Sequence, residues 1–470
     1  MVIPEFPEGH IRVLVERPKD NSLIEAAETC LAGEDPTPSI QSYITNNASF
    51  PFVIDPSYGA VAIGAGGGST DVSLIELRPQ NSQRFLVRAF VKASSPADIP
   101  RTLNDQLVHS DPRIGVLRTC SNSRAVGTNF DVQQKLRTKR LVDAGYDGRG
   151  VAIAIVDTGI YRDRIAKLLG ELTPGRAPAC DAANSWTPAA VATRPFQHRI
   201  GHGTMCAHDA LISAPKATLL DIAMLLDRAP GDRGVPGTVG AAVKAFSFLA
   251  NKWVDWTTIG STRPYQALVI SNSWGIFHPS LEPSTGAVRY IDNPNHAFRL
   301  YFVRPLFRAG VDILFASNNC GPECPAATCL NKTTGMIMGA NAYEEVLTIG
   351  GCDTNNDRVG YSSQGPSIAG MFSNKPDLTA YTHFLGSKSQ RIWAPDTGVS
   401  TACPVAAGCV AALRSALPPT TTTTRVLFDT LMATTIVGNG STTPAGQWNK
   451  DYGCGIINPI DAALSLGLGV

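Results

Sequence analysis

The sequence lacks long apolar runs, and it lacks an excess of charge of either sign. No segment approaches the roughly 18 consecutive apolar residues of a membrane-spanning helix. Its 40 Lys and Arg residues nearly balance its 39 Asp and Glu residues, for a formal net charge of +1. This balance argues against a general nucleic-acid or membrane-surface role. We therefore expect neither a nucleic acid nor a membrane as a partner, and we expect a monomer.

The first 20 residues also lack a basic stretch followed by an apolar stretch, so no signal peptide is expected. The 11 cysteines are scattered and odd in number, unlike the dense, even framework of a small secreted domain. Both features favour a cytoplasmic, reducing compartment, with secretion as the alternative. Cys320, Cys324 and Cys329 fit no familiar zinc spacing. A disulfide or a loop of free thiols is favoured there over a metal site.

The sequence changes its pattern near residue 120. Residues 1–120 have the short apolar segments and helix-like segments of a small α+β unit. Strands are predicted at 11–16, 61–64, 71–78, 85–91 and 114–119, and helices at 22–31 and 97–109. This order resembles a ferredoxin-like layer with an insertion around 32–60. The glycine-rich residues 64–72 lack the spacing of a nucleotide-binding loop, and we interpret them as a flexible hairpin.

The polar residues 121–135 have no periodicity, and we interpret them as a linker. From 136 to 470, buried strands alternate with helical stretches, which predicts an α/β domain. We expect a doubly wound, mainly parallel sheet with helices on both faces. Its strands are predicted at 151–156, 219–225, 267–273, 311–317 and 346–350.

Three segments of this second region end in groups that together activate a serine hydroxyl. GVAIAIVDTGI (150–160) places Asp157 at the carboxyl end of a buried strand, where α/β sheets carry their sites. GHGTMCAHDA (201–210) places His202 between two glycines at a helix start. GVSTACP (398–404) places Ser400 at the start of an apolar helix, whose free N–H groups favour a developing oxyanion.

Each of these residues alone has an ordinary explanation. Asp157 could cap a turn, His202 could cap a helix or lie in the core, and Ser400 could be a helix N-cap. Together they supply a carboxylate that orients the imidazole, a general base that later protonates the leaving amine, and a nucleophile. The same three groups occur in several chain orders on unrelated folds, so their order here is informative.

These three segments and four others resemble the subtilase family, whose chain order is Asp, His, Ser and whose serine motif has the form G-T-S-M-A-x-P. The four others are SAPKATLL (213–220), YSSQGPS (361–367), KPDLTA (375–380) and DYGCGIINPIDAAL (451–464). The resemblance covers most of 140–465. It implies a subtilisin-like fold and a serine endopeptidase that cleaves protein or peptide substrates through an acyl-enzyme. It implies no cofactor and no metal for the chemistry, with structural calcium as an expectation.

Further site residues follow from the resemblance. ILFASNNCG (313–321) resembles the family strand that ends in A-G-N, so Asn318 is expected to donate its amide to the oxyanion. ISNSWG (270–275) resembles the strand edge that pairs with an extended substrate, so Ser273, Trp274 and Gly275 are expected to bind the peptide. Trp274 is expected to form a wall of the substrate pocket, with a core aromatic as the alternative.

Some positions depart from the family pattern. Val399 and Thr401 replace Thr and Met beside the serine, and Ser317 replaces the Gly before the expected oxyanion Asn. These changes remove no reacting group, but the substrate specificity of known family members cannot be carried over to this chain. Cys206 matches a cysteine of proteinase-K-like members, and we expect a buried thiol beneath the site that makes activity sensitive to mercurials.

The N-terminal unit has the position and size of a subtilase prodomain. We expect residues 1–120 to act as an intramolecular inhibitor, with the strand at 114–119 leading the linker into the active cleft. Autocleavage is expected between Thr119 and Gly127, and a permanent accessory domain is the alternative. For the whole chain, an active endopeptidase is favoured over an inactive binding module, because no catalytic group is missing. A processing enzyme dedicated to one partner is a further reading of the same catalytic groups.

Overall fold

The computed structural model describes residues 9–47, 50–116, 119–120, 123–172, 177–227, 237–258, 263–387 and 394–470, except the side chains of 171 and 172. At its centre is a seven-stranded sheet in the order β16-β15-β14-β12-β8-β10-β9, in which every pairing is parallel. Its strands are β8 (Val151–Val156), β9 (Ala179–Cys180), β10 (Thr218–Ile222), β12 (Ala267–Asn272), β14 (Asp312–Ala316), β15 (Leu347–Cys352) and β16 (Leu378–Tyr381).

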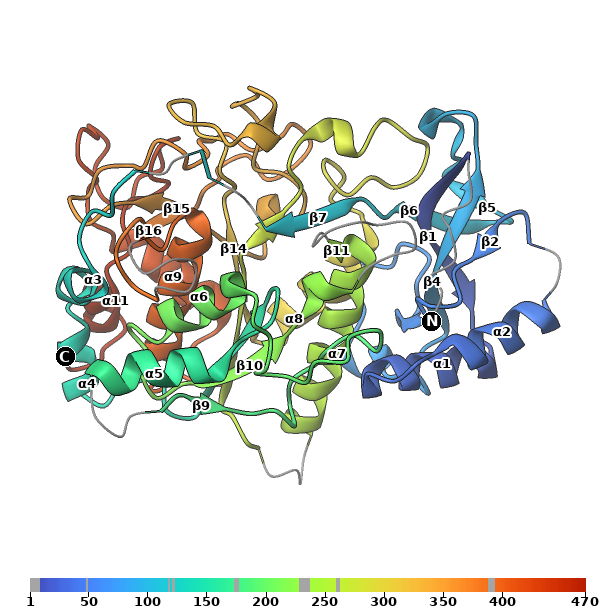
Figure 1. Ribbon diagram of the computed structural model, residues 1–470, viewed down its shortest axis with the longest axis horizontal. Helices are drawn as coiled ribbons and strands as arrows, with labels where there is room; N and C mark the ends of the chain where they lie inside the picture. Colours follow the sequence, from blue (N-terminus) through green and yellow to red (C-terminus); the bar gives the residue numbers. More distant parts are fainter. Residues whose placement is uncertain are drawn as a thin grey trace.

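Helices cover both faces of this sheet (Figure 1). On β8, Ala152, Ala154 and Val156 belong to one buried cluster with α7, whereas Val151 and Ile153 belong to the other with α6 and α9. This alternation follows because successive side chains of a strand point to opposite faces. The helices of this region are α3 (Asn129–Leu136), α4 (Thr138–Asp143), α5 (Arg162–Leu172), α6 (Gly201–Ala210), α7 (Val239–Thr257), α8 (Arg304–Arg308), α9 (Val399–Arg414), α10 (Thr424–Ala433) and α11 (Pro459–Ser465). The predicted doubly wound α/β fold is confirmed.

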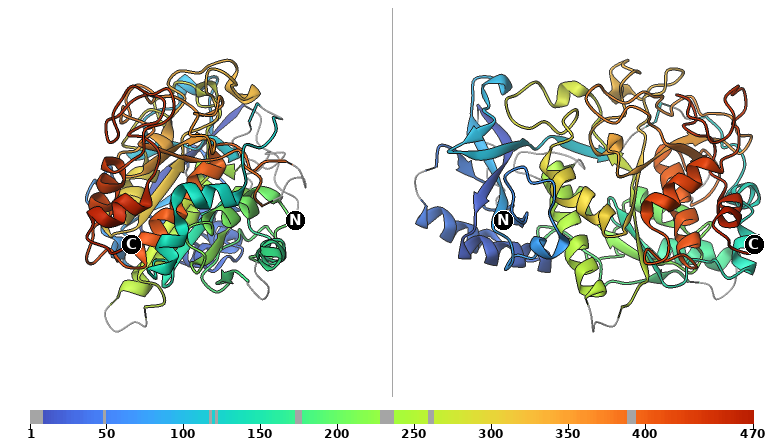
Figure 2. Two further views of the ribbon diagram at one scale, coloured as in Figure 1. Left: turned by 90° about the vertical axis from the view of Figure 1, so that its left-hand side faces the viewer. Right: turned by 180° about the vertical axis from the view of Figure 1, so that it is seen from behind.

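The N-terminal residues form a separate antiparallel sheet in the order β2-β4-β1-β6-β5, and β3 also pairs with β4. Its strands are β1 (His10–Pro18), β2 (Val53–Ile54), β3 (Val61–Ala62), β4 (Arg84–Lys92), β5 (Thr102–Leu103) and β6 (Gln106–Ser110). Two helices, α1 (Asn21–Ala32) and α2 (Thr37–Asn46), complete the α+β unit. The unit lies at one end of the molecule, and the C-terminal helices lie at the other (Figure 2).

Two local predictions for this unit are wrong. Instead of a helix at 97–109, a short 3-10 turn at Pro96–Asp98 is followed by the hairpin β5–β6. Ser95 does cap the turn, but Pro100 disfavours helical geometry in the residue before it. Asn104 and Asp105 then adopt positive φ angles, which suit a tight hairpin turn.

The predicted strand at 71–78 is instead a 3-10 turn, Leu74–Leu77. Ser73 and Glu76 form a capping box at its start, a local bond pattern that competes with strand pairing. In the preceding loop, Gly67 N–H donates to Glu16 Oε2 at 2.7 Å and Gly68 N–H donates to the Tyr301 hydroxyl at 2.9 Å. These N–H groups are therefore bound by the protein itself.

The two sheets are joined by one continuous core. Leu14, Tyr58 and Leu86 of the N-terminal unit belong to the same buried cluster as Phe246 and Trp253 of α7. The strand β7 (Arg113–Val116) leaves the N-terminal sheet and runs toward the start of α9 (Figure 1). The predicted strand at 114–119 is thus present as far as Val116, and residues 117–118 lie outside the described part of the chain.

Candidate active site

Asp157 and His202 form a hydrogen-bonded pair at the carboxyl edge of the parallel sheet. Asp157 directly follows β8, and His202 lies in the first turn of α6. His202 Nδ1 lies 2.8 Å from Asp157 Oδ1 and 3.0 Å from Oδ2. Thr158 N–H also donates to Oδ1 at 2.7 Å. A carboxylate held this way fixes the imidazole tautomer that leaves Nε2 free to accept a proton.

The glycine after His202 is required by close packing. A Cβ atom at Gly203 would lie 2.4 Å from the carbonyl oxygen of Gly159, in the turn that follows Asp157. Gly159 itself has a φ of +89° and packs against the ring of His198. The two glycines therefore let α6 approach the Asp157 turn closely enough for the Asp–His contact.

Ser400 lies in the first turn of α9, and a proline inside this helix shapes its surroundings. Pro404 has no N–H, so the helix cannot supply a donor to the Ser400 carbonyl four residues earlier. Ser273 Oγ donates to that carbonyl at 2.9 Å, and the Cys206 thiol donates at 3.4 Å. The sequence around Ser400 thus binds three separate segments together.

The hydroxyl of Ser400 is not bonded to His202. Ser400 Oγ donates to the carbonyl oxygen of Ser273 at 3.4 Å. His202 Nε2 is buried and has no partner among the residues that the structure describes. Nucleophile–base contacts are often open before substrate binds, so the missing Ser–His bond is compatible with the predicted roles of these groups.

The amide of Asn318 does not point toward Ser400. Its Nδ2 donates to the carbonyl oxygens of Ile276 at 3.2 Å and Met336 at 3.0 Å. Its φ is +87°, which asparagine tolerates better than other non-glycine residues. Its side chain therefore braces two loops, and this geometry does not support the predicted oxyanion contact.

The next residue, Asn319, lies beside the start of α9, which carries Ser400. Its Oδ1 accepts the Val399 N–H at 2.9 Å, and its Nδ2 would lie 3.0 Å from a Cβ atom placed on Gly398. The resemblance predicts the first of two consecutive asparagines, whereas the structure places the second one at α9. The signal that separates them is the turn at Asn318, whose positive φ aims the following side chain at α9.

The predicted substrate-pairing edge is occupied by the chain itself. In β13 (Trp274–Gly275), Trp274 pairs with Val116 and Gly275 pairs with Gly115 of β7. On its other side, β7 pairs with β11 (Gly237–Thr238). Both pairings are antiparallel, so β7 is the middle strand of a three-stranded sheet that ends near Ser400.

The side chain of Trp274 lies in the core rather than in a pocket wall. It is fully buried, and its ring packs at 5.0 Å on Phe315 and at 6.2 Å on Phe298. The alternative of a core aromatic is therefore the one that the structure supports. The backbone of Trp274 still serves strand pairing.

The cysteines divide into two disulfides and a set of free thiols. Cys120 is bonded to Cys324 and Cys320 to Cys329, so the 320–329 loop carries disulfides and not a thiolate metal site. Cys206 is a buried free thiol, 4.0 Å from both His202 Nδ1 and Asp157 Oδ2. Burial raises the pKa of this thiol well above its usual value, so it stays neutral.

Two groups of His, Cys and Asp are compact enough to hold an ion among the described residues. One consists of Asp157, His202 and Cys206. An ion there would compete with Asp157 for the Nδ1 atom of His202. The other is the buried set His208, Asp209 and Asp396. Burial raises the pKa of both aspartates well above the usual value, so protonation offers an explanation for this pair without a metal.

A buried carboxyl supports the turn after Asp157. Asp221 Oδ2 accepts the N–H groups of Phe196 at 2.6 Å and Ile160 at 3.1 Å. Burial raises the pKa of Asp221 to about 7, the two N–H groups oppose that rise, and the Asp157 charge adds to it. The turn after Asp157 is therefore supported by a buried carboxyl whose pKa lies well above its usual value.

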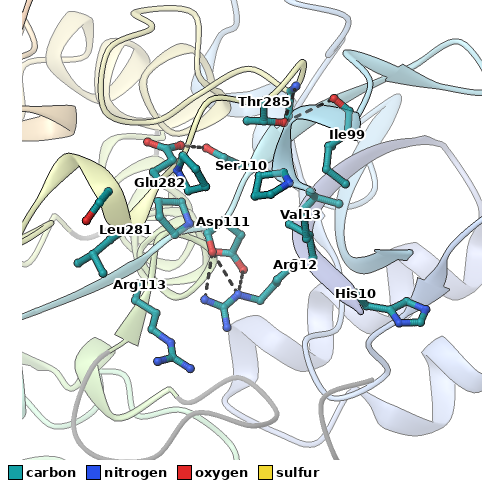
Figure 3. A pocket seen from close by; sticks show the side chains of 16 residues that line it. His10, Arg12, Val13, Ile99, Ser110, Asp111, Arg113, Leu281, Glu282 and Thr285 are labelled. Atoms are coloured by element: carbon teal, nitrogen blue, oxygen red, sulfur yellow. Dashed lines mark hydrogen bonds and ion pairs between the residues drawn. The ribbon is translucent and has the colours of Figure 1, made fainter. Parts of the chain in front are cut away.

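A cavity of about 420 Å³ lies away from the catalytic groups, where β1, the β6–β7 turn and the 280–285 loop meet (Figure 3). Arg12 and Asp111 form an ion pair on its wall at 3.2 Å. Ser110, the residue before Asp111, donates to Glu282. The cavity marks the junction of the N-terminal unit with the rest of the chain.

With this fold and site, the chain belongs to the subtilase family, whose Peptidase_S8 model matches residues 148–455. It is similar to serine protease AprX of Bacillus subtilis (strain 168), with 26% identity over 352 residues that cover 65% of this chain and 68% of the relative. It is similar to Bacillopeptidase F of the same strain, with 26% identity over 348 residues that cover 69% of this chain and 21% of the relative. Bovine (Bos taurus) furin is 26% identical over 287 residues, 59% of this chain and 32% of furin.

Family membership identifies the chain as a serine peptidase of the hydrolase class, with protein or peptide substrates. Of the three relatives, two extend far beyond the region matched here. Among the described residues, no helix is long and apolar enough to cross a membrane.

Proposed function

We propose that the protein is a serine endopeptidase that acts through Ser400, His202 and Asp157. The observation that carries this is the 2.8 Å contact between His202 Nδ1 and Asp157 Oδ1. The Nε2 atom of the same ring is buried and has no partner in the described part of the chain. When a substrate binds, Ser400 Oγ turns from Ser273 toward Nε2 and attacks the carbonyl carbon, while His202 takes the proton. The imidazolium then protonates the leaving amine, and water hydrolyses the acyl-enzyme.

We assign the oxyanion to Asn319 rather than Asn318, together with the N–H of Ser400. The Asn319 amide lies at the Gly398 turn, and its Oδ1 is fixed by Val399 N–H. A fixed donor at the point where charge develops stabilises the transition state without reorganisation. Asn318 supports it, because Asn318 Oδ1 accepts the Asn319 N–H at 2.8 Å.

The structure supports a self-inhibited precursor. The strand β7 occupies the edge between β11 and β13 as an extended substrate would. Ser273, whose carbonyl contacts Ser400 Oγ, directly precedes Trp274, the partner of Val116. Thr119 Cγ2 would lie 3.3 Å from a Cβ atom on Gly398. The cut is therefore proposed between residues 116 and 119, just before the window expected from the sequence.

The N-terminal unit is proposed to remain bound after the cut. The continuous core between Leu14, Tyr58 and α7 resembles the interior of one domain, and such apolar interfaces are typical of lasting associations. The unit would then be both an inhibitor and a persistent part of the enzyme, unless a further cut removes it. Structural calcium and the monomeric state remain predictions.

The compartment is proposed from the cysteines. Two disulfides, Cys120–Cys324 and Cys320–Cys329, support formation in an oxidising compartment, because cytoplasmic thiols are kept reduced. This favours the secreted alternative over the cytoplasm.

The direct test uses a fluorophosphonate probe on the wild type, Ser400→Ala and His202→Ala, with intact mass before and after incubation. We expect labelling and self-cleavage of the wild type alone. Absence of both in a folded wild type, with and without a dithiol, would favour the inactive binding module. Hydrolysis of casein, compared with hydrolysis of single candidate partner proteins, then separates a general protease from a dedicated processing enzyme.

A further inference from the structure

The strand β7 is held at its two ends by contacts of different chemistry. Before the strand, Asp111 accepts from Arg88 Nε at 2.9 Å and from Gly240 N–H at 2.7 Å, and it pairs with Arg12 (Figure 3). After the strand, Cys120 is bonded to Cys324. Cys324 lies in the loop that follows Asn319. The strand in the active cleft is thus fixed by charges on one side of Ser400 and by a covalent bond on the other.

The disulfide beyond β7 is open to solvent, whereas its neighbour is not. Cys120 is exposed and Cys324 is half-buried. In the other disulfide, Cys320 and Cys329 are both at most 1% exposed. Thiol–disulfide exchange needs access to a sulfur atom, so a dithiol in solution reaches Cys120–Cys324 first.

We propose that the Cys120–Cys324 disulfide is a redox latch on self-cleavage. The inference rests on the proposed function and adds a regulatory site to it. A cut between 116 and 119 leaves the new amino group within three residues of Cys120, which the disulfide ties to the loop after Asn319. The acyl group on Ser400 is meanwhile held by β7 and the Asp111 network.

The latch makes the cut reversible. The retained amine attacks the acyl-enzyme carbonyl, the ester bond to Ser400 Oγ breaks, the peptide bond forms again, and His202 moves the proton from the amine to Oγ. Well-oriented intramolecular groups have effective molarities on the order of 10⁵ M, far above the roughly 55 M of water that competes for the same ester. While the disulfide is intact, the uncut chain therefore persists.

Reduction releases the segment. A thiolate of a dithiol attacks one sulfur of the pair, and the other leaves and is protonated to a thiol. The second thiolate of the dithiol then breaks the mixed disulfide, so the dithiol is oxidised and both cysteines are reduced. After reduction, hydrogen bonds hold the residues that follow Cys120. They include the bond from Val126 N–H to the His383 carbonyl at 2.8 Å and the contact between the Ser123 and His383 side chains at 2.8 Å. The amine can then leave, and water completes the hydrolysis.

The test follows the cut fraction of full-length protein by intact mass under oxidising conditions and in dithiothreitol, with alkylation to identify the reduced pair. We expect the wild type to be mainly intact when oxidised, with cleavage at least about tenfold faster once Cys120 and Cys324 are reduced. Cys120→Ser and Cys324→Ser should cut without a reductant. Cys454→Ser, which removes a half-buried free thiol, should behave as the wild type.

Each remaining outcome is decisive. Complete cleavage of the oxidised wild type, or a rate unchanged when both latch cysteines are alkylated, overturns the latch while leaving the protease intact. Fragments that stay disulfide-linked in denaturant would place the cut after Cys120 and also overturn it. No cleavage and no probe labelling of Ser400 in any variant or redox state would instead refute the proposed function. If a cysteine variant fails to fold, mild reduction of the folded wild type tests the same proposal without a substitution.

Discussion

Ser273 and Ser400 exchange hydrogen bonds in both directions. Ser273 Oγ donates to the Ser400 carbonyl at 2.9 Å, and Ser400 Oγ donates to the Ser273 carbonyl at 3.4 Å. The first bond replaces the one that Pro404 cannot make within the helix. The pair joins the segment that precedes β13 to the proposed nucleophile, so a change at Ser273 acts directly on Ser400.

Replacing Ser273 with alanine should therefore weaken both stability and turnover. The buried Ser400 carbonyl would keep only the weak Cys206 thiol donor, and we expect a loss of about 1–2 kcal/mol in the free energy of unfolding. Denaturant titration of Ser273→Ala in a Ser400→Ala background measures it. The matched control is Ser271→Ala on the adjacent strand, whose hydroxyl contact is Cys403 Sγ at 3.8 Å. An equal loss in both variants would contradict the assigned role.

The two asparagines after β14 should separate in kinetics. Asn319→Ala removes the proposed oxyanion donor, and we expect kcat to fall about 10²–10³-fold with little change in KM. Asn318→Gly keeps the positive φ but removes the brace to Ile276 and Met336 and the acceptor of the Asn319 N–H. Because Asn319 keeps its bond to Val399 N–H, kcat should fall less than about tenfold. Peptide hydrolysis by the two variants measures both values. The reverse order would restore Asn318 as the oxyanion residue.

The buried charges at Asp111 should govern the docking of the N-terminal unit. Burial opposes ionisation of Asp111, but Arg88 and Arg12 outweigh it and lower the Asp111 pKa. Asp111→Asn leaves two buried guanidinium groups without their shared charge, and we expect a loss of about 3–5 kcal/mol. Denaturation of the uncut Ser400→Ala chain measures the loss. Asp255→Asn removes an exposed pair with Arg78 and should cost less than about 1 kcal/mol.

Asp221 should give stability a pH dependence. Its folded pKa of about 7 exceeds the usual 3.8, so between these values the folded state holds a proton that the unfolded state has lost. The stabilisation is complete below about pH 4 and is lost as pH rises toward 7. Asp221→Asn keeps an acceptor for the N–H groups of Phe196 and Ile160, and its unfolding free energy should fall less over this range. Asp429→Asn, on an exposed part of α10, should follow the wild type, and an unchanged slope in Asp221→Asn would refute the assignment.

Cys206 should be the thiol through which mercurials inhibit. It lies 3.4 Å from the Ser400 carbonyl, so a mercury atom there displaces the nucleophile and the base. Cys206→Ala should retain activity within about tenfold and lose mercurial sensitivity, whereas Cys409→Ala, buried on the same helix as Ser400, should stay sensitive. Titration of peptide hydrolysis with a mercurial distinguishes the two, and inhibition of Cys206→Ala at wild-type concentrations would place the effect elsewhere.

The sequence alone determined the parts whose signals are local. Apolar runs such as 151–156 predict parallel strands that are buried on both faces. Asp157, His202 and Ser400 lie in segments whose glycines and helix starts are typical of the family motifs. The predictions from sequence were wrong where two local patterns favour different structures. Ser95–Pro96 begins a helical turn that Pro100 ends, and Asn318 and Asn319 are indistinguishable until a backbone angle selects one.

Tertiary structure decided what depends on contacts between distant segments. The burial of Trp274, the pairing of Cys120 with Cys324 across 204 residues, and the insertion of β7 between β11 and β13 each join positions that share no local pattern. A strand edge shows its free backbone groups only once the sheet is built, and a cysteine shows its partner only once the chain brings the two sulfur atoms together. The sequence therefore determined which groups carry the proposed chemistry, and the tertiary structure decided which segments lie against them.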